Sequence, residues 1–500
     1  MYLNSKRVKA YLDLARGCEK EYPCDAVVAY ANALSLAPQA KDIQEFYQTA
    51  LDGVFKTFVE KKLVDIDEWE TCRTDPKEAL AMLREQQAQV GFTDLKFEKS
   101  SFDDEKQRNY KFILTWPVSE YYGWGVFGLN LFKKVLRRGR RGPRVSILEK
   151  PKLIKGSPNA KLIEPYEQEQ QELEKLTEKN LRKIIKIKDS VLLHAVNPNL
   201  SRRKTSQSFW GTANLGVVFL ENTLLHKRML ATVSDFNYLI VGSKWNGDIL
   251  TQDGANNVRL LHQGIDDTIF YPKKIEKNFK DRFVVFSGGK LEYRKGQDLI
   301  IEAFKRFVKK HPDAILMSAW FTLWANSMDS LIRNSPYLDS LPIKGDNGNV
   351  GIANWLEEMG IPKNNVFDLG FMPNYETPKA LLQADVAVFP NRCEGGTNLV
   401  AMEAMACGLP CIIANNTGQK DLISDDNCYP LLEQNRLDLD PASHKGWGES
   451  SIDEILENLE CAYADRKKRK KIGLRGALFM KDWTWKKQTE KLLQYCDEIM

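Results

Sequence analysis

The chain has 500 residues, a length that exceeds one ordinary hydrophobic core and predicts two or three domains with a cleft between them. Its 72 Lys and Arg residues nearly balance its 67 Asp and Glu residues, for a formal charge of +5, so the composition does not indicate a nucleic-acid-binding protein. The nine cysteines include no CxxC pair, which argues against a zinc site or a disulfide framework and favours a reducing compartment.

The N-terminal segment MYLNSKRVKAYLDLARG shows no apolar core followed by a cleavage site, and no apolar run of the chain is long enough to span a bilayer. A cytoplasmic location is therefore predicted. Residues 1–105 are predicted to form a small helical domain, because CDAVVAYANALSLAP spaces Ala26, Tyr30, Ala33 and Leu34 at helical intervals before a proline. This stretch resembles the second helix of a tetratricopeptide repeat, although a plain amphipathic helix fits as well. A helical extension of this kind is suited to binding a protein partner.

Residues 106–275 are predicted to form a first α/β domain. Strand-like apolar runs alternate there with polar or helical stretches, and the runs are YKFILTWPV, RVSILE, SVLLHAV, LGVVFLE and YLIVGS. Alternating strands and helices predict a parallel, doubly wound sheet that is covered on both faces. The segment YYGWGVFG, with Gly123 and Gly125, is predicted to be the glycine turn after the first strand, although a plain turn explains it nearly as well.

A lysine-rich stretch at residues 271–282 is predicted to link two domains. The alternation then restarts over residues 276–479 with FVVFSGG, DLIIEAFKRFVKK, AILMSAW, VFDLGF, TPKALLQA, DVAVFP, NLVAMEAMA and PCIIA, and it predicts a second Rossmann-like domain. Ligands of such sheets bind beyond the carboxyl ends of the strands. We therefore expect one crevice where the loops after four strands converge, at Phe286, Leu369, Phe389 and Ala414.

The stretch FPNRCEGGTNLVAMEAMACGLP, residues 389–410, is the first candidate site in this crevice. Gly395 and Gly396 leave room for a phosphate to approach the backbone. Thr397 or Asn398 is predicted to cap a helix whose free N–H groups favour an anion. A tight turn that simply requires glycine is the alternative interpretation.

The stretch FSGGKLEYRKGQDLIIEAF is the second candidate site. Lys290, Arg294 and Lys295 cluster at the carboxyl end of a strand, ahead of a helix that is predicted to begin near Gln297 or Asp298. Such cations are usually solvated. In the same crevice as a diglycine loop, however, they would neutralise a leaving diphosphate without a metal ion.

These two stretches resemble the nucleotide-binding half of the GT-B glycosyltransferases, in particular the large retaining family four. GKLEYRKG, residues 289–296, matches the family pattern in register, with Lys290 in place of the usual arginine. EAMACGLP, which begins at Glu403, matches the second part of another hallmark of the family. In that hallmark a first glutamate stands eight positions before this one. Here Glu394 and Glu403 are nine apart (403 − 394 = 9), so the loop carries one extra residue.

The resemblance covers residues 110–500 and implies roles for individual side chains. It assigns Glu403 to the donor ribose hydroxyls, which a carboxylate accepts from in pairs. It places Glu394 near the donor sugar as a catalytic residue, together with the two diphosphate cations Lys290 and Lys295. It adds to the donor site Gly288, Gly289, Phe371, Gly395, Gly396, Thr397, Asn398 and Leu399.

The first domain contributes further candidates. His194, at the end of SVLLHAV, corresponds to a family histidine that reaches the donor sugar and is predicted to be catalytic, although a lone histidine is more often structural. The predicted acceptor-side residues are Glu221, Asn222, Gly123 and Gly125. The resemblance also implies that DWTWKKQTEKLLQYC, within residues 480–500, is a helix that crosses back to complete the first domain.

The leading hypothesis is a hexosyltransferase that moves a sugar from a nucleoside diphosphate sugar to an unidentified acceptor, which is a carbohydrate-bearing glycan, lipid or protein. Retention of configuration is what the resemblance implies. No cofactor and no divalent metal are expected, because the crevice has no DxD aspartate pair. The alternatives are a nucleotide-sugar epimerase or a phosphorylase of the same fold, or a non-catalytic scaffold that binds a partner through its helical N-terminus.

Two basic runs remain outside this scheme, KKVLRRGRRGPR at residues 133–144 and DRKKRKK at residues 465–471. Basic runs near helix ends usually lie on solvated loops. Contact with an anionic membrane surface is the less favoured interpretation, and no nucleic-acid partner is expected.

Overall fold

The computed structural model describes residues 108–139, 142–179, 184–225, 227–322, 325–343, 351–437 and 444–500, together with residues 12, 30, 40, 41, 44–47 and 49. Apart from those few positions, the predicted helical extension over residues 1–105, with its tetratricopeptide-like stretch, lies outside the described residues. Within the described part, no helix combines the length and the apolar character that crossing a membrane requires.

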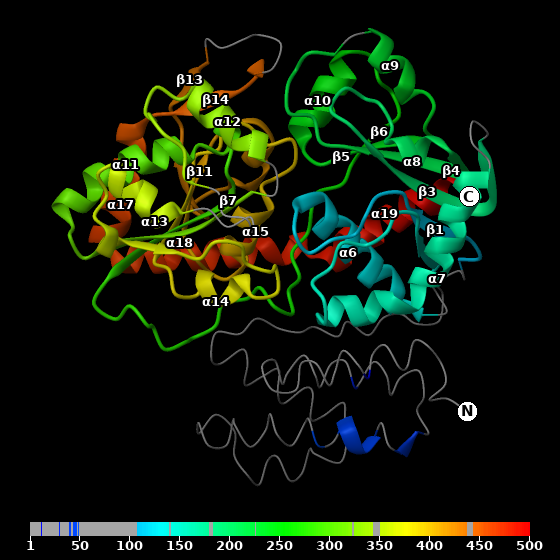
Figure 1. Cartoon of the computed structure of the whole chain (residues 1–500), viewed down its shortest axis with the longest axis horizontal. Coiled ribbons are helices and arrows are strands. Elements are labelled where there is room, and N and C mark those ends of the chain that lie inside the picture. Colours follow the sequence, from blue (N-terminus) through cyan, green and yellow to red (C-terminus); the bar gives the residue numbers. More distant parts are fainter. Residues whose placement is uncertain are drawn as a thin grey trace. The chain divides into compact units, whose positions relative to one another are not determined.

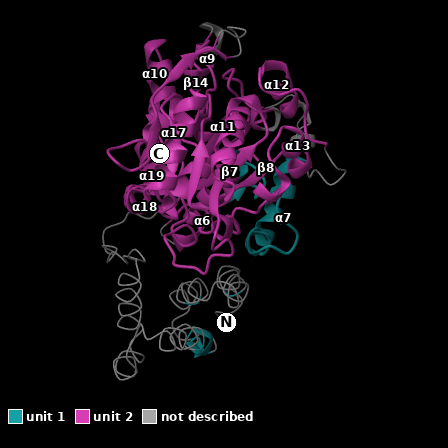
Figure 2. Cartoon of the chain, turned by 90° about the vertical axis from the view of Figure 1, so that its left-hand side faces the viewer, with its two compact units in different colours: residues 1–106, 117–125, 146–181 teal, residues 107–116, 126–145, 182–500 magenta. Residues whose placement is uncertain are grey.

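The chain divides into two compact units (Figure 2). The first unit comprises residues 1–106, 117–125 and 146–181, and the second comprises residues 107–116, 126–145 and 182–500. In the first unit, the carboxylate of Glu120 is buried and accepts hydrogen bonds from the backbone of Ile154 and from the side chains of Ser157 and Asn159. These three bonds satisfy a charge that would otherwise be costly to bury.

The first sheet has six strands in the order β2-β1-β3-β4-β5-β6, an order typical of doubly wound folds. The strands are β1 (Lys111–Leu114), β2 (Arg144–Ile147), β3 (Ile185–Val196), β4 (Phe209–Val218), β5 (Tyr238–Val241) and β6 (Val258–Leu260). The pairs β1–β3, β3–β4, β4–β5 and β5–β6 are parallel. The five predicted strands are confirmed. The sixth, β6, was not predicted, because its three residues are only half-buried and form no apolar run.

Five helices follow the strands of this sheet, namely α6 (Gly123–Arg137), α7 (Pro158–Lys179), α8 (Lys204–Gln207), α9 (Lys227–Val233) and α10 (Lys244–Gln252). The prediction of a glycine turn was wrong in one respect, since Gly123 and Gly125 lie in the first turn of α6. The requirement at position 125 is one of packing. A Cβ atom there would lie 2.2 Å from the Cβ atom of Ser119.

The first basic run is not simply solvated. Lys133 and Lys134 belong to α6, and the Nζ atom of each lies 3.4 Å from a carboxylate oxygen of Asp266. Asp266 and Lys134 are both buried, so these charges neutralise each other inside the protein.

The second sheet also has six strands, in the order β12-β11-β10-β7-β8-β9, and all of its pairs are parallel. The strands are β7 (Phe283–Lys290), β8 (Ala314–Phe321), β9 (Val366–Asp368), β10 (Val386–Phe389), β11 (Cys411–Ala414) and β12 (Tyr429–Leu431). The strand order reverses between β7 and β10, and the crevice at such a reversal is where doubly wound sheets bind ligands. The loops after β7 and β10 carry the two candidate sites predicted above.

Helices lie on both faces of the second sheet (Figure 1), and alternate residues of its strands enter two separate cores. Val285, Val388 and Ile412 pack with α11 (Gln297–Lys310), α13 (Ile352–Glu358) and α17 (Ile452–Ala464). Phe286, Phe389 and Ile413 pack with α14 (Thr377–Leu381) and α15 (Leu399–Ala406). A sheet with helices on both faces is the predicted fold class, which is thereby confirmed.

The other α-helices and strands of the described residues are α12 (Ala325–Asn334), the antiparallel pair β13 (Gln434–Arg436) and β14 (Gly448–Ser450), α18 (Arg466–Met480) and α19 (Trp485–Ile499). Helix α19 lies against the first sheet, because the Tyr495 hydroxyl donates to the carbonyl of Leu260 and the Tyr238 hydroxyl donates to Glu498. The second basic run forms the start of α18, so the prediction of a loop was wrong, although the lysines of this run are exposed to solvent.

Candidate active site

The loops after β7 and β10 are joined by their backbones. The amide of Arg392 donates to the carbonyl of Arg294 at 2.8 Å. Gly296 has a φ of 70°, and a Cβ atom there would lie 2.5 Å from the carbonyl oxygen of Pro390. Only glycine meets both demands, the left-handed backbone and the close approach. This glycine therefore allows the two loops to meet where the strand order reverses.

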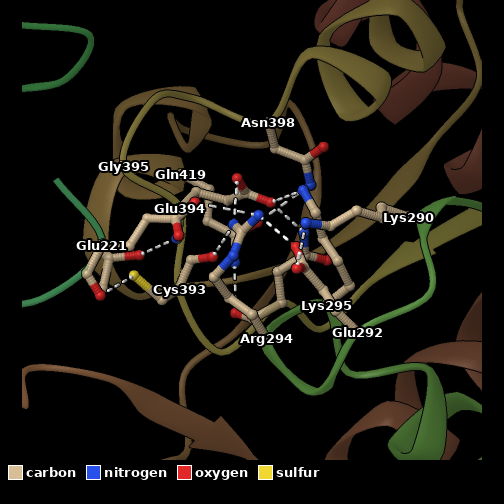
Figure 3. A network of polar contacts seen from close by, with 12 residues as sticks. Glu221, Lys290, Glu292, Arg294, Lys295, Cys393, Glu394, Gly395, Asn398 and Gln419 are labelled. Carbon is tan, nitrogen blue, oxygen red and sulfur yellow. Dashed lines mark hydrogen bonds and ion pairs between the residues drawn. The ribbon is translucent and has the colours of Figure 1, made fainter. Parts of the chain in front are cut away.

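Glu394 lies at the centre of the polar contacts that this junction creates (Figure 3). Its carboxylate is buried and accepts from Lys295 Nζ at 2.5 Å, from Arg294 Nη1 at 3.0 Å and from the Asn391 amide. Burial alone would raise the pKa of Glu394, but the positive charges of Lys295 and Arg294 lower this pKa to about 2. Glu394 is thus ionised over the whole physiological range.

Arg294 ties this carboxylate to the first sheet. Its guanidinium lies 2.6 Å from Glu292 and 3.2 Å from Glu221, which follows β4, and it donates to the carbonyl of Cys393 at 2.8 Å. Figure 3 shows Arg294 between Glu221 and Glu394. Arg294 was predicted only as a member of the cation cluster, and its ion pair with Glu394 was not predicted.

Lys290 is the more peripheral of the two predicted diphosphate cations. Its Nζ atom lies 2.5 Å from Glu292, and its side chain is 34% exposed, against 16% for Lys295. The structure therefore brings Lys295, Arg294 and Glu394 together, with Lys290 at the edge of this group.

Glu403 lies apart from this cluster, on α15. It is buried and accepts a hydrogen bond from the Asn374 amide at 2.5 Å. Burial raises the pKa of Glu403 to about 8, so the side chain is mainly a neutral acid at pH 7. A neutral acid donates one hydrogen bond and accepts others, whereas the sequence led us to expect a carboxylate that only accepts. The two glutamates of the motif therefore differ in charge at pH 7, since Glu394 is an anion and Glu403 is mainly neutral.

The diglycine loop contacts protein where we expected a ligand. A Cβ atom on Gly395 would lie 2.5 Å from the carbonyl oxygen of Leu220, and one on Gly396 would lie 2.8 Å from Gln263 Oε1. The Ser243 hydroxyl donates to the carbonyl of Gly395 at 2.8 Å. The immediate reason for two glycines is thus the close approach of loops that follow strands of the first sheet.

The start of α15 follows the predicted pattern. Asn398 is the N-cap, with a φ of 63° and a side chain that accepts from the Ala401 amide at 3.3 Å. The Thr397 hydroxyl contacts the Met402 sulfur at 3.1 Å instead. Leu399 is the first residue of the helix.

His194 is not brought to this group. It is fully buried, with its Nδ1 atom 2.6 Å from the Ser206 hydroxyl and its Nε2 atom 3.0 Å from Asn214 Oδ1. Its ring lies within 6 Å of the rings of Trp210 and Phe236. Burial lowers the pKa of His194 to about 4. Both ring nitrogens have partners in the first domain, so the structure supports the structural interpretation over the catalytic one.

The other predicted residues are dispersed. Phe371 packs against Phe321 with ring centroids 4.9 Å apart, and a Cβ atom on Gly288 would lie 2.9 Å from the Phe286 ring. Gly289 has a φ of 141° at the end of β7. The Asn222 side chain accepts from the Leu224 amide at 3.0 Å, so it caps its own turn.

The most deeply buried charge next to the site was missed. Arg392 is fully buried and makes a two-pronged ion pair with Asp298, with both N–O distances 2.8 Å. Its guanidinium lies 3.7 Å from the centre of the Tyr293 ring and also binds Glu449. An arginine after a buried strand gives no signal of this kind, because Asp298 lies 94 positions away in the chain and Glu449 lies 57 away.

Comparison with known protein families matches residues 341–479 to the model described as Glycosyl transferases group 1. This span contains Glu394 and Glu403. It begins after the cation motif at residues 289–296.

Two curated relatives are less than a third identical to this chain over the residues that align. The chain is 24% identical over 221 residues to the GDP-mannose-dependent alpha-(1-6)-phosphatidylinositol monomannoside mannosyltransferase of Mycolicibacterium smegmatis, which covers 43% of this chain and 47% of that protein. It is 25% identical over 181 residues to mannosylfructose-phosphate synthase of Agrobacterium fabrum, which covers 34% and 36% respectively. The chain thus spans less than half the length of these relatives.

Solved structures resemble a larger part of the chain. Sucrose-phosphate synthase from Thermosynechococcus elongatus aligns with a TM-score of 0.54 and 15% identity, over 78% of this chain and 99% of that one. The Anabaena protein HepE in complex with UDP-glucose aligns with a TM-score of 0.52 and 13% identity, over 78% and 99%. At these identities the likeness establishes the fold, which is the GT-B arrangement of two Rossmann-like domains.

Proposed function

Because residues 341–479 match the model described as Glycosyl transferases group 1, we propose that the chain transfers a hexose from a nucleoside diphosphate sugar to a carbohydrate-bearing acceptor. The observation that carries this proposal is the meeting of Lys295, Arg294 and Glu394 where the strand order of the second sheet reverses. Paired cations at that edge suit a departing diphosphate.

In this proposal the donor diphosphate lies against Lys295 and the start of α15 at Asn398, with Lys290 at the outer edge. These groups stabilise the negative charge that develops as the bond between sugar and phosphate breaks. Glu403 binds the ribose hydroxyls, and Glu394 holds Lys295 in place beside the donor sugar. Because protein side chains supply the positive charge, the reaction needs no divalent metal ion.

Donor entry also requires a movement. Leu220 and Gln263 lie against the diglycine loop, so the donor reaches Gly395 and Gly396 only after the loops of the first sheet withdraw. Their return then excludes water from the reacting sugar. Retention of the anomeric configuration is proposed on the likeness of residues 289–296 to the retaining family.

The test is a donor panel with the full chain. UDP-glucose, GDP-mannose and ADP-glucose are supplied in turn, and free nucleoside diphosphate is measured together with the anomeric configuration of the transferred sugar. We expect release from one donor, with retention, and the same rate after EDTA treatment. If no donor binds and no nucleoside diphosphate is released from any donor, the scaffold hypothesis is favoured instead. A loss in EDTA that added Mg²⁺ or Mn²⁺ restores would contradict the metal-independent mechanism.

We expect His194→Gln to reduce stability rather than turnover. Loss of the bonds to Ser206 and Asn214 should lower the free energy of unfolding by about 2 kcal/mol at pH 7, while the folded protein keeps its donor turnover. The pKa of His194 is lower in the folded chain, about 4 against the ordinary 6.5, so its contribution to stability is present above pH 6.5 and is lost as the pH falls towards 4. Urea unfolding at several pH values measures this slope. A large fall in turnover at unchanged stability would restore a catalytic role.

A further inference from the structure

Helix α18 (Arg466–Met480) has two chemically different faces. The face toward the protein includes two glycines that allow close packing. A Cβ atom on Gly473 would lie 2.1 Å from the carbonyl oxygen of Gly408, and one on Gly476 would lie 3.0 Å from the carbonyl oxygen of Asn427. Gly473 and Gly476 therefore fix which side of α18 is buried.

The opposite face of α18 is exposed and combines leucine with lysine. Leu474 and Leu478 are 45% and 56% exposed, one helical turn apart. Exposed lysines flank them along the helix and at its C-cap. At a helical rotation of 100° per residue, all six side chains fall within an arc of about 100°. We call this face the α18 stripe, and its residues are Lys467, Lys470, Lys471, Leu474, Leu478 and Lys481.

The surroundings of the α18 stripe are strongly basic. Residues 465–487 contain ten Lys and Arg and two Asp, a net charge of 10 − 2 = +8, so the rest of the chain sums to 5 − 8 = −3. Both aspartates are engaged, because Asp465 caps α18 and Asp482 pairs with Lys487.

The lysines of the stripe keep their charge available. Two other basic residues of α18 are paired, since Arg469 pairs with Asp385 and Arg475 pairs with Asp426. Among the described residues, no ion pair involves Lys467, Lys470 or Lys471. Exposed leucines that are surrounded by these lysines favour a partner that is anionic at its surface and apolar beneath it.

We propose that the α18 stripe docks the protein on an anionic membrane surface. The helix lies parallel to that surface, Leu474 and Leu478 enter the boundary between head groups and acyl chains, and the lysines pair with anionic head groups. A nucleic acid would also attract the lysines, but it offers the two leucines no apolar environment. This inference is independent of sugar transfer, since none of the six residues belongs to the proposed donor site.

The test is co-sedimentation of the full chain with vesicles of phosphatidylcholine alone and of phosphatidylcholine mixed with phosphatidylglycerol. We expect binding to the mixed vesicles only, weakened by added salt. The triple variant K467Q, K470Q and K471Q should lower the apparent affinity on the order of 100-fold, at roughly fivefold per lysine. The double variant L474S and L478S should lower it by about tenfold, because the apolar contribution is lost.

A matched control separates the stripe from the net charge. Lys273, Lys274 and Lys309 are exposed and lie outside α18, so K273Q, K274Q and K309Q remove the same charge and should leave binding nearly unchanged. In L474W, vesicle binding should shift tryptophan fluorescence to shorter wavelength. Donor turnover without vesicles should be unaffected in every variant, so a failure here is distinct from a failure of the proposed transferase activity.

Three results would overturn the proposal. They are an absence of binding to the mixed vesicles, equal losses in the control and stripe triple variants, and full binding by the leucine variant. The last of these, combined with binding to a DNA duplex that depends on the same lysines, would identify a nucleic-acid surface instead.

Discussion

Glu403→Ala should lower kcat/KM for the donor by about 100-fold, which corresponds to the loss of two buried hydrogen bonds to the ribose. Hydrogen bonds to the ribose are expected to be equally strong in the bound donor and in the transition state, so most of the loss should appear in KM. Glu403 is buried, and in this structure it accepts a hydrogen bond from Asn374. The measurement is the release of nucleoside diphosphate over a range of donor concentrations.

Glu433→Gln is the matched control for this result. Glu433 is an exposed glutamate of the same domain, and its substitution should leave donor kinetics unchanged. Wild-type turnover in a folded Glu403→Ala protein would remove the ribose assignment, whatever happens in the control.

Glu403→Gln should make the protein more stable than the wild type as the pH rises. The pKa of Glu403 is about 8 in the folded chain, above its ordinary value of 4.5. The folded protein therefore holds a proton that the unfolded chain has lost between these values, and its stability falls as the pH rises through that window. A glutamine side chain does not titrate. The free energy of unfolding of the variant, relative to that of the wild type, should therefore be larger at pH 7 than at pH 4.5 by on the order of 3 kcal/mol. Parallel stability curves for the two proteins over this range would show that Glu403 is ionised in the folded protein.

Arg392→Met should have the largest effect on folding, a loss of about 3–5 kcal/mol in the free energy of unfolding. Methionine fills much of the space of the arginine stem but leaves the buried carboxylate of Asp298 without a partner. The ion pair has no exposed surface on either side chain. Denaturant unfolding of the full chain measures the loss.

Two further variants isolate the charge effect. Adding Asp298→Leu to Arg392→Met removes the orphaned carboxylate, so the double variant should recover part of the lost stability. Arg306→Met breaks the exposed pair of Arg306 with Asp453 and should cost less than about 1 kcal/mol. If Arg392→Met costs no more than Arg306→Met, the buried pair does not stabilise the fold in the way we describe.

Local pattern accounts for most of the predicted fold. Strands such as β7, β10 and β11 are short apolar runs beside glycine-rich turns, and their alternation with helices predicted two doubly wound sheets. Short or polar elements were missed. β6 is a half-buried three-residue strand, and α18 begins with six basic residues, so neither shows the apolar periodicity on which such predictions depend.

The candidate site was predicted only in outline. Sequence position located Lys295, Glu394, Glu403 and the N-cap Asn398, because strand ends and helix starts are local features. The partners of these residues were not predictable in the same way. Arg294 reaches both Glu221 and Glu394, and Arg392 reaches Asp298, through contacts that depend on how distant segments fold together.

By itself, then, the sequence determined the order of most strands and helices and the position of the two glutamates that flank the diglycine loop. Tertiary structure alone decided what those glutamates are. Glu394 is an anion because Lys295 and Arg294 lie against it, and Glu403 is mainly a neutral acid because burial is offset only by the amide of Asn374. The physical reason is that the charge state of a buried carboxyl group depends on solvent exclusion and on charges within a few ångströms, and residues that are neighbours in space are seldom neighbours in the chain.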